Sequence, residues 1–281
     1  MSASASAPPQ VRWDLSALFS GNDDPKIQES WERAHAAADT FAAKYRGQID
    51  VPDLSPATLA TALKELEDLV AQASKPINFA HLQFACDTGN AALGAFLQKQ
   101  MEKSTELSVK LMFFDLELQA APDEVIQRAI NDPVMANYVH YVTVARTFSK
   151  HRLTEAEEVI LEETANTGSR AWERLFEEVT SNYTYKLVRP GQDKSEEVSQ
   201  EEVLNLLRDS NRELRQAASD AFTAGLKDME RVLVFTYNNL IQDKAVDDRL
   251  REYEYPEHSR HLANEHDKET VDLVISKCQA K

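Results

Sequence analysis

The stretch TEAEEVILEETANTGSRAWERLFEEVTSNYTYKLV, residues 154–188, predicts the fold around it. Thr154 and Glu157 fit a capping box, in which each side chain accepts a hydrogen bond from the other residue's backbone N–H. Gly168 is placed to end this helix in a left-handed turn. The apolar stripe between these signals is Ala156, Val159 and Ile160. The first half of the stretch therefore predicts an amphipathic helix.

A second helix and a hairpin are predicted directly afterwards. The apolar residues of the helix, spaced i, i+3, i+4 and i+7, are Trp172, Leu175, Phe176 and Val179. From Tyr183 the apolar period changes from 3.6 to 2, which is typical of a strand. Residues 189–193 can turn the chain, and Val198 lies in a return strand. Trp172 and Phe176 could line a groove, but their helical spacing favours core packing.

Composition and charge limit the class of protein. The chain has 281 residues, only 7 glycines and a formal charge of −16 from 47 acidic and 31 basic residues. Few glycines fit a helix-rich fold, and an acidic chain lacks the basic surface that nucleic-acid binding needs. No apolar run is long enough to span a membrane, and residues 1–10 do not form a signal peptide. We expect a cytoplasmic protein with no nucleic-acid or membrane partner.

Further helices are predicted on both sides of the opening stretch. Upstream, an antiparallel helical hairpin, three shorter helices and one long helix are expected, over residues 24–45, 55–73, 76–86, 91–119, 122–131 and about 139–145. Downstream, Ser199 with Glu202 and Ser210 with Glu213 each fit a capping box. The second box opens an apolar pattern that continues to about Leu250. A last helix covers residues 268–278, after a loop at 254–257.

These elements define a mainly α fold class. We expect a multi-helix array with one small β-hairpin near residues 183–199. The division is a disordered tail at 1–10, helical hairpins and a long helix at 11–121, helices and the hairpin at 122–199, and a last unit at 200–281. A short apolar segment at 13–19 is expected to dock on the helices. Cys86 and Cys278 are interpreted as two buried thiols in a reducing compartment.

The histidines do not form a recognisable metal motif. His258, His261 and His266 cluster beside Glu265. Positions five apart on a helix diverge by roughly 140°, so His261 and His266 cannot share a metal ion from a regular helix. His258 and His261 could, but Pro256 favours a solvated polar loop over a metal site.

The other residues that could suggest catalysis are also interpreted as structural. His140, which has apolar neighbours, is interpreted as a hydrogen-bonded packing residue rather than a catalytic base. The acidic run at 155–163 could suggest a carboxylate pair, but its place at a helix start favours a solvated face. There is no G-x-S-x-G elbow and no Gly-rich phosphate loop. From the residues alone we predict no catalytic, cofactor-binding or metal-binding residue.

Several segments nevertheless resemble one family. They are T-G-S-x-A-W at 167–172, L-F-E-E-V-T-S at 175–181, V-L-N-L-L-R-D-S-N-R-E-L-R-Q-A-A-S-D-A-F at 203–222, D-R-L-R-E-Y-E-Y-P at 248–256 and W-D-L-S-A-L-F at 13–19. In order and spacing, the chain resembles the N-terminal half of the oligoendopeptidase F family of thimet-type zinc metallopeptidases. The resemblance spans about residues 11–278.

The resemblance implies a helical bowl with a deep channel in which short peptides are hydrolysed. In that family a zinc ion is held by H-E-x-x-H and a further glutamate in the C-terminal half, and no position here matches those ligands. We therefore expect a truncated N-terminal part whose partners are short peptides and the catalytic half, with zinc in the full-length enzyme and none in this chain. The alternatives are a shortened paralogue acting as a non-catalytic helical peptide- or protein-binding module, and an inert truncation product.

Overall fold

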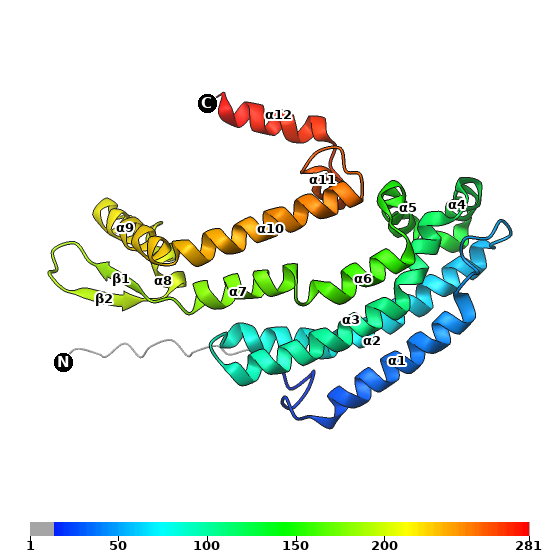
Figure 1. The fold of residues 1–281 in the computed structure, drawn as a ribbon, viewed down its shortest axis with the longest axis horizontal. Helices are drawn as coiled ribbons and strands as arrows, with labels where there is room; N and C mark the ends of the chain where they lie inside the picture. The colour runs from blue at the N-terminus through cyan, green and yellow to red at the C-terminus, as the bar shows by residue number, and fades with distance from the viewer. Residues whose placement is uncertain (1–13, 281) are drawn as a thin grey trace, which may run out of the picture.

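The computed structural model describes residues 14–280 and is a mainly helical array with one two-stranded hairpin, as predicted (Figure 1). The predicted tail at 1–10 and Trp13 lie outside the described residues. The elements are α1 (Pro25–Tyr45), α2 (Pro56–Cys86), α3 (Ala91–Ala120), α4 (Asp123–Ile130), the 3₁₀ turn η1 (Pro133–Met135), α5 (Val139–Thr147), the 3₁₀ turn η2 (Ser149–His151), α6 (Glu155–Ala165), α7 (Ser169–Ser181), β1 (Tyr185–Val188), β2 (Ser195–Val198), α8 (Gln200–Leu206), α9 (Arg212–Asp228), α10 (Glu230–Leu250), α11 (His258–Ala263) and α12 (Lys268–Gln279).

The main core lies between α1, α2 and α3, which pack against one another. Asp24 caps α1, and its side chain accepts a hydrogen bond from the Lys26 N–H. Trp31 is buried, and its Nε1–H donates to the buried Oε1 of Gln100 at 2.8 Å. The predicted docking of the 13–19 segment is confirmed for Phe19, which is buried with its ring centroid 5.4 Å from that of Phe79.

Helix α2 is longer than expected. The sequence predicted separate helices on either side of Pro76, whereas one helix runs through it. Proline removes one backbone donor and crowds the preceding turn. Ala73, Phe79 and Ala80 are buried on the two sides of Pro76, so packing holds both turns in one helix despite that loss.

The end of α3 is fixed by an arginine of α5. The Nη1 group of Arg146 donates to the carbonyl oxygens of Leu118, Gln119 and Ala121 at 3.2, 2.7 and 2.7 Å. These are carbonyls that a helix end leaves without an intrahelical partner. A cation there also complements the negative end of the helix dipole.

The predicted hairpin is confirmed and rests on a second core. Strands β1 and β2 pair antiparallel, with Tyr185 opposite Val198. Tyr185 and Leu187 are buried, and β1 packs on α9. At Gly225 of α9, an added Cβ would lie 2.5 Å from the Tyr185 ring, so only glycine allows this close approach.

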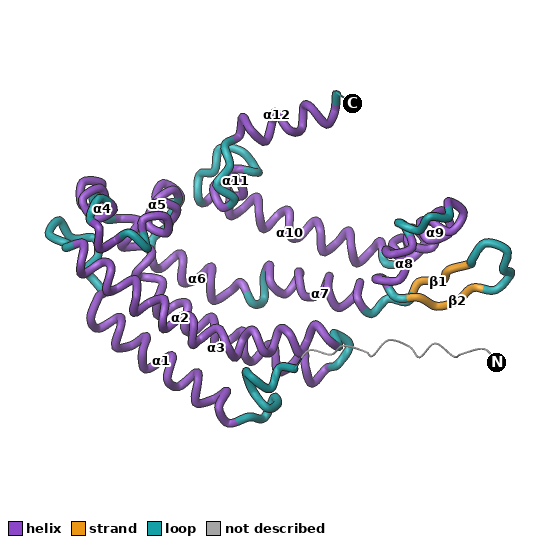
Figure 2. The backbone as a smooth tube through the Cα atoms, turned by 180° about the vertical axis from the view of Figure 1, so that it is seen from behind, coloured by secondary structure: helices purple, strands orange, loops and turns teal. Residues whose placement is uncertain are grey.

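The chain continues beyond the hairpin along the other side of α6 and α7. Both views show α10 beside these helices, followed by α11 and then α12 (Figures 1 and 2). Helix α10 packs on α7, and the Trp172 and Phe235 rings meet edge-on with centroids 5.4 Å apart. None of the residues of α12 is buried. No described helix is long and apolar enough to cross a membrane.

Three predicted helix boundaries were wrong. Gly168 does not end α6 in a left-handed turn, because its φ is −98° and it is the N-cap of α7. Ser210 does not cap α9: Asn211 does, and its side-chain Oδ1 accepts a hydrogen bond from the Glu213 N–H. The helical pattern expected to run on to Leu250 is divided at Met229, whose buried side chain lies in the hairpin core.

Candidate functional site

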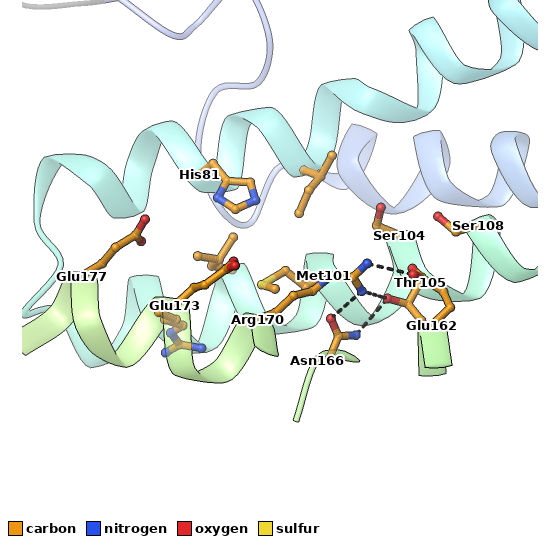
Figure 3. Close-up of a pocket in the computed structure, with 13 residues that line it drawn as sticks. His81, Met101, Ser104, Thr105, Ser108, Glu162, Asn166, Arg170, Glu173 and Glu177 are labelled. Atoms are coloured by element: carbon orange, nitrogen blue, oxygen red, sulfur yellow. Dashed lines mark hydrogen bonds and ion pairs between the residues drawn. The ribbon is translucent and has the colours of Figure 1, made fainter. Parts of the chain in front are cut away.

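A cleft of about 360 Å³ lies where α2 and α3 face α6 and α7 (Figure 3). Its apolar lining comes from Ile77, Leu97 and Met101. Polar side chains of α6 and α7 form the opposite wall, and His81 of α2 lies across from them. Most of the lining residues are therefore polar or charged, whereas the usual site for a small ligand is lined mainly by apolar side chains.

Arg170 organises the polar wall of this cleft. Its Nη1 group donates to Thr105 Oγ1 at 3.3 Å and to Asn166 Oδ1 at 3.2 Å, and its Nη2 group donates to Glu162 Oε2 at 2.8 Å. The Asn166 side chain also donates to Thr105 Oγ1 at 2.9 Å. This network joins α3 to both α6 and α7 and holds the wall rigid (Figure 3).

Arg174 is engaged in a similar way one turn along α7. Its Nε donates to Glu178 Oε1 at 2.7 Å and its Nη1 to Gln98 Oε1 at 3.2 Å. The guanidinium carbon also lies 5.5 Å from the centroid of the Phe84 ring. Both arginines are therefore held by groups of the protein, and the exposed carboxylates Glu173 and Glu177 complete the rim.

The acidic run was predicted as a solvated face, and this was wrong for Glu158 and Glu162. Their side chains retain only 14% and 19% exposure, and each pairs with an arginine. Arg251, which follows α10, donates to Glu158 through Nη1 and Nη2 at 2.6 and 2.8 Å. Burial by itself raises the pKa of Glu158, but the hydrogen bonds from Arg251 and from the Leu153 N–H outweigh it and lower that pKa.

A second cleft, of about 520 Å³, lies between α6 and α10. Leu161 and Leu240 contribute apolar surface from the two facing helices, and the Glu158–Arg251 pair lies at its lining. Glu162 and Glu173 line both clefts, so the junction of α6 and α7 forms a shared wall between them.

The described histidines do not fit a zinc ion. His261 is buried in α11 rather than in the expected polar loop, and its Nδ1 lies 3.2 Å from the Tyr255 hydroxyl. His258 also lies in α11, where its Nδ1 accepts from the Glu254 N–H at 3.3 Å. Within residues 14–280 there is no group of three His, Cys, Asp or Glu residues that could hold a metal ion.

Three other predictions about single residues were wrong. His140 was expected to pack, but its side chain is 76% exposed and its Nε2 lies 3.1 Å from Glu265 Oε1. Cys86 and Cys278, expected to be buried, are both exposed. Phe176 was expected in the core, but it is 49% exposed because α10 covers only part of the apolar face of α7.

Sequence reasoning missed the arginines that connect the helices. Arg170 and Arg174 are spaced four apart, which places them on one face of α7. That spacing was the available signal, but it does not indicate which acceptors on α3 the side chains reach. The 93-residue separation of Glu158 and Arg251 gave no local signal at all.

Comparisons with known proteins show which family and which solved structures this chain resembles. Residues 117–185 match the family described as Oligopeptidase F. The fold is similar to the crystal structure of oligoendopeptidase-F from Enterococcus faecium, with a TM-score of 0.72 and 17% identity over 89% of this chain and 47% of that one. The fold is also similar to the crystal structure of a protein from Chlamydophila abortus that carries the provisional name peptidase. The TM-score is 0.53, and the sequence identity is 19% over 89% of this chain and 41% of that one. No curated protein sequence matches the chain.

The resemblance to the N-terminal part of oligoendopeptidase F is thereby confirmed, together with the predicted fold class. The chain spans about half the length of the Enterococcus structure that it matches. The family match runs from the end of α3 through α7 to the first residue of β1, and it includes the wall of both clefts.

Proposed function

We propose that this chain is the N-terminal part of a cytoplasmic zinc metalloendopeptidase that hydrolyses short peptides, and that its helices form walls of the substrate channel. The observation that carries the proposal is the Oligopeptidase F match over residues 117–185. The zinc ion and the residues that activate water would be supplied by a catalytic half outside this chain.

The composition of the clefts supports a role in holding peptides. An extended peptide presents alternating N–H and C=O groups, and each needs a partner when water is displaced. The first cleft offers hydroxyl, amide and carboxylate groups beside an apolar floor. Such a wall can bind many sequences, because most of its hydrogen bonds would be made to the peptide backbone.

Exposed apolar side chains support the second partner, the catalytic half. Several of them lie on α10 and α12, namely Val234, Phe235, Tyr237, Ile241, Leu273, Val274 and Ile275. Exposed apolar side chains that gather into a patch mark interaction sites, and these residues are candidates for such a patch. We propose the division 11–121, 122–199 and 200–281 for this part of the enzyme, with the last unit packing against the catalytic half.

The test is to read the gene beyond codon 281 and to express the complete product. A downstream H-E-x-x-H helix and chelator-sensitive cleavage of a quenched fluorescent peptide are the expected results. The 281-residue chain alone should release no fluorescence, since none of its described residues forms a zinc site.

A natural stop after codon 281, with peptide binding but no cleavage, would replace this proposal with the non-catalytic binding module. Zinc-dependent cleavage by the 281-residue chain itself would contradict the division of labour between the two halves.

A further inference from the structure

The part of the chain that matches the Oligopeptidase F family meets a later segment at one point of the structure. Glu158 lies in the first turn of α6, within the matched residues 117–185, and Arg251 lies in the D-R-L-R-E-Y-E-Y-P segment at 248–256. They pair through two hydrogen bonds of 2.6 and 2.8 Å, and both side chains are at least four-fifths buried. A bidentate arginine–carboxylate pair fixes orientation as well as distance.

Arg251 is held from several sides at once. Its Nε donates to Asp247 Oδ1 at 2.8 Å, one turn earlier in α10. Its Nη1 also donates to the His151 carbonyl at 3.3 Å, while His151 Nδ1 lies 2.8 Å from the Arg251 carbonyl oxygen. Because a carbonyl only accepts, His151 carries its proton on Nδ1. The C-terminal end of α10 is thus tied to the segment that precedes α6.

Aromatic stacking extends this connection to the next helix. The His151 ring stacks on Tyr253 with centroids 4.1 Å apart and meets His258 edge-on at 5.2 Å. Tyr255 in turn stacks on His258 at 4.8 Å. The turn of residues 251–257 is therefore seated on His151 and leads directly into α11.

The segment that follows has few other attachments to the described body. We call α11 and α12, with the residues between them, the arm. Helix α11 packs against α5, and the exposed His140–Glu265 pair is a second contact. Glu252 and Glu265 adopt φ values of 56° and 54°, a left-handed conformation that non-glycine residues adopt only when their surroundings impose it.

We propose that the Glu158–Arg251 pair is a latch that sets the direction in which the arm leaves α10. The latch holds the left-handed turn at Glu252 and keeps His151 beneath Tyr253. Glu158 and Arg251 are positioning residues, because neither lines the arm itself. The inference does not depend on peptidase activity, since it concerns the geometry of this chain.

Cys86 and Cys278 provide a direct measurement of this geometry. They are the two cysteines of the chain, both are exposed, and they lie at the end of α2 and near the end of α12. With a nitroxide label on each, double electron–electron resonance reports the distribution of distances between the body and the arm. We expect one narrow distribution in the unsubstituted protein and a distribution at least twice as broad in Glu158→Gln.

The matched control is Glu155→Gln, on the same helix. Glu155 also pairs with an arginine, Arg46, at 2.6 Å, but both side chains are nearly half exposed and neither contacts the arm. This variant should leave the distance distribution unchanged. Glu158→Asp, which keeps the charge on a shorter side chain, should give an intermediate width.

Circular dichroism separates an effect on the arm from general unfolding. The proposal expects Glu158→Gln to retain its helical signal while the distances broaden. A narrow distribution in Glu158→Gln, or equal broadening in Glu155→Gln, would overturn it. If Glu158→Gln loses its helical signal, Arg251→Lys is measured instead, and an unchanged narrow distribution there would also overturn the latch.

Discussion

The body formed by α1, α2 and α3 and the region formed by α7, α10 and α12 use the same kind of amphipathic sequence with different results. In α1 the spaced apolar residues from Ile27 to Tyr45 are buried against two neighbouring helices. Helix α10 buries only Thr236, and α12 buries none of its residues. Apolar spacing predicts which face of a helix can be covered, whereas burial also requires a partner that covers it.

The largest expected difference between the regions comes from removing one aromatic ring from each. Phe114 is completely buried, so Phe114→Ala should lower the free energy of unfolding by about 3–5 kcal/mol. Phe235 on α10 is 58% exposed, and Phe235→Ala should cost less than about 1 kcal/mol. Urea titration followed by circular dichroism measures both values. Equal costs would show that α10 is covered in solution, for example by self-association.

A smaller effect is expected at the connection between the two regions. Glu158→Gln removes a carboxylate that accepts from Arg251 and leaves this guanidinium largely buried, which should cost about 2 kcal/mol. Glu155→Gln breaks an exposed pair and should cost less than about 1 kcal/mol. Thermal unfolding of the two variants in parallel tests this ordering. The reverse ordering would contradict the burial of the Glu158 pair.

Substitutions at two glycines of the body distinguish the stability cost of backbone strain from the cost of altered packing. Gly47 has a φ of +73° and Gly21 does not lie in the left-handed region, while an added Cβ would meet no atom within 4 Å at either position. Gly47→Ala should therefore cost about 1–2 kcal/mol through strain alone. Gly21→Ala should change stability by less than about 0.5 kcal/mol. Similar melting temperatures for the two variants would contradict this account.

The smallest expected effect is a difference in how α1 and α12 lose stability at acidic pH, when their N-cap residues Asp24 and Asp267 become protonated. Backbone hydrogen bonds from Ser20 and Lys26 lower the pKa of Asp24, and a backbone hydrogen bond from Thr270 lowers that of Asp267. A lowered folded-state pKa gives stability that is present above the ordinary value of 3.8 and is lost as the pH falls through the lowered value.

Amide hydrogen exchange between pH 5 and pH 3 can follow the two caps separately. Exchange at α12 should accelerate first, because no buried residue supports that helix once its cap is protonated. Helix α1 keeps its buried face and should respond only with global unfolding. Simultaneous acceleration in both helices would show that the arm and the body unfold as one unit.

Local signals account for most of the fold that was predicted. Capping boxes at Thr154 and Ser199, the proline after Asp24 and the period change at Tyr183 each act within a few residues, and each is observed. The errors arose where distant contacts decide the outcome. Pro76 is tolerated because of packing on both sides of it, and Glu158 is buried by an arginine 93 residues away.

The candidate site could be predicted only as a general location. The stretch at 154–188 includes the wall shared by the two clefts, but the sequence does not show that Thr105 and Gln98 of α3 lie opposite Arg170 and Arg174. The three clustered histidines were interpreted as parts of a solvated polar loop. His258 and His261 instead lie in α11, in a setting that depends on Tyr253 and Tyr255, which sequence spacing does not reveal.

The contact between Gly225 and Tyr185 has a consequence for how this protein can vary. Since even a methyl group at position 225 would overlap the rings of both Tyr185 and Tyr183, the three positions are expected to change together or not at all. Smaller residues at both 183 and 185 would free space for alanine at 225, whereas alanine alone would push the hairpin away from α9. Among related chains, these three positions should therefore behave as a single inherited unit.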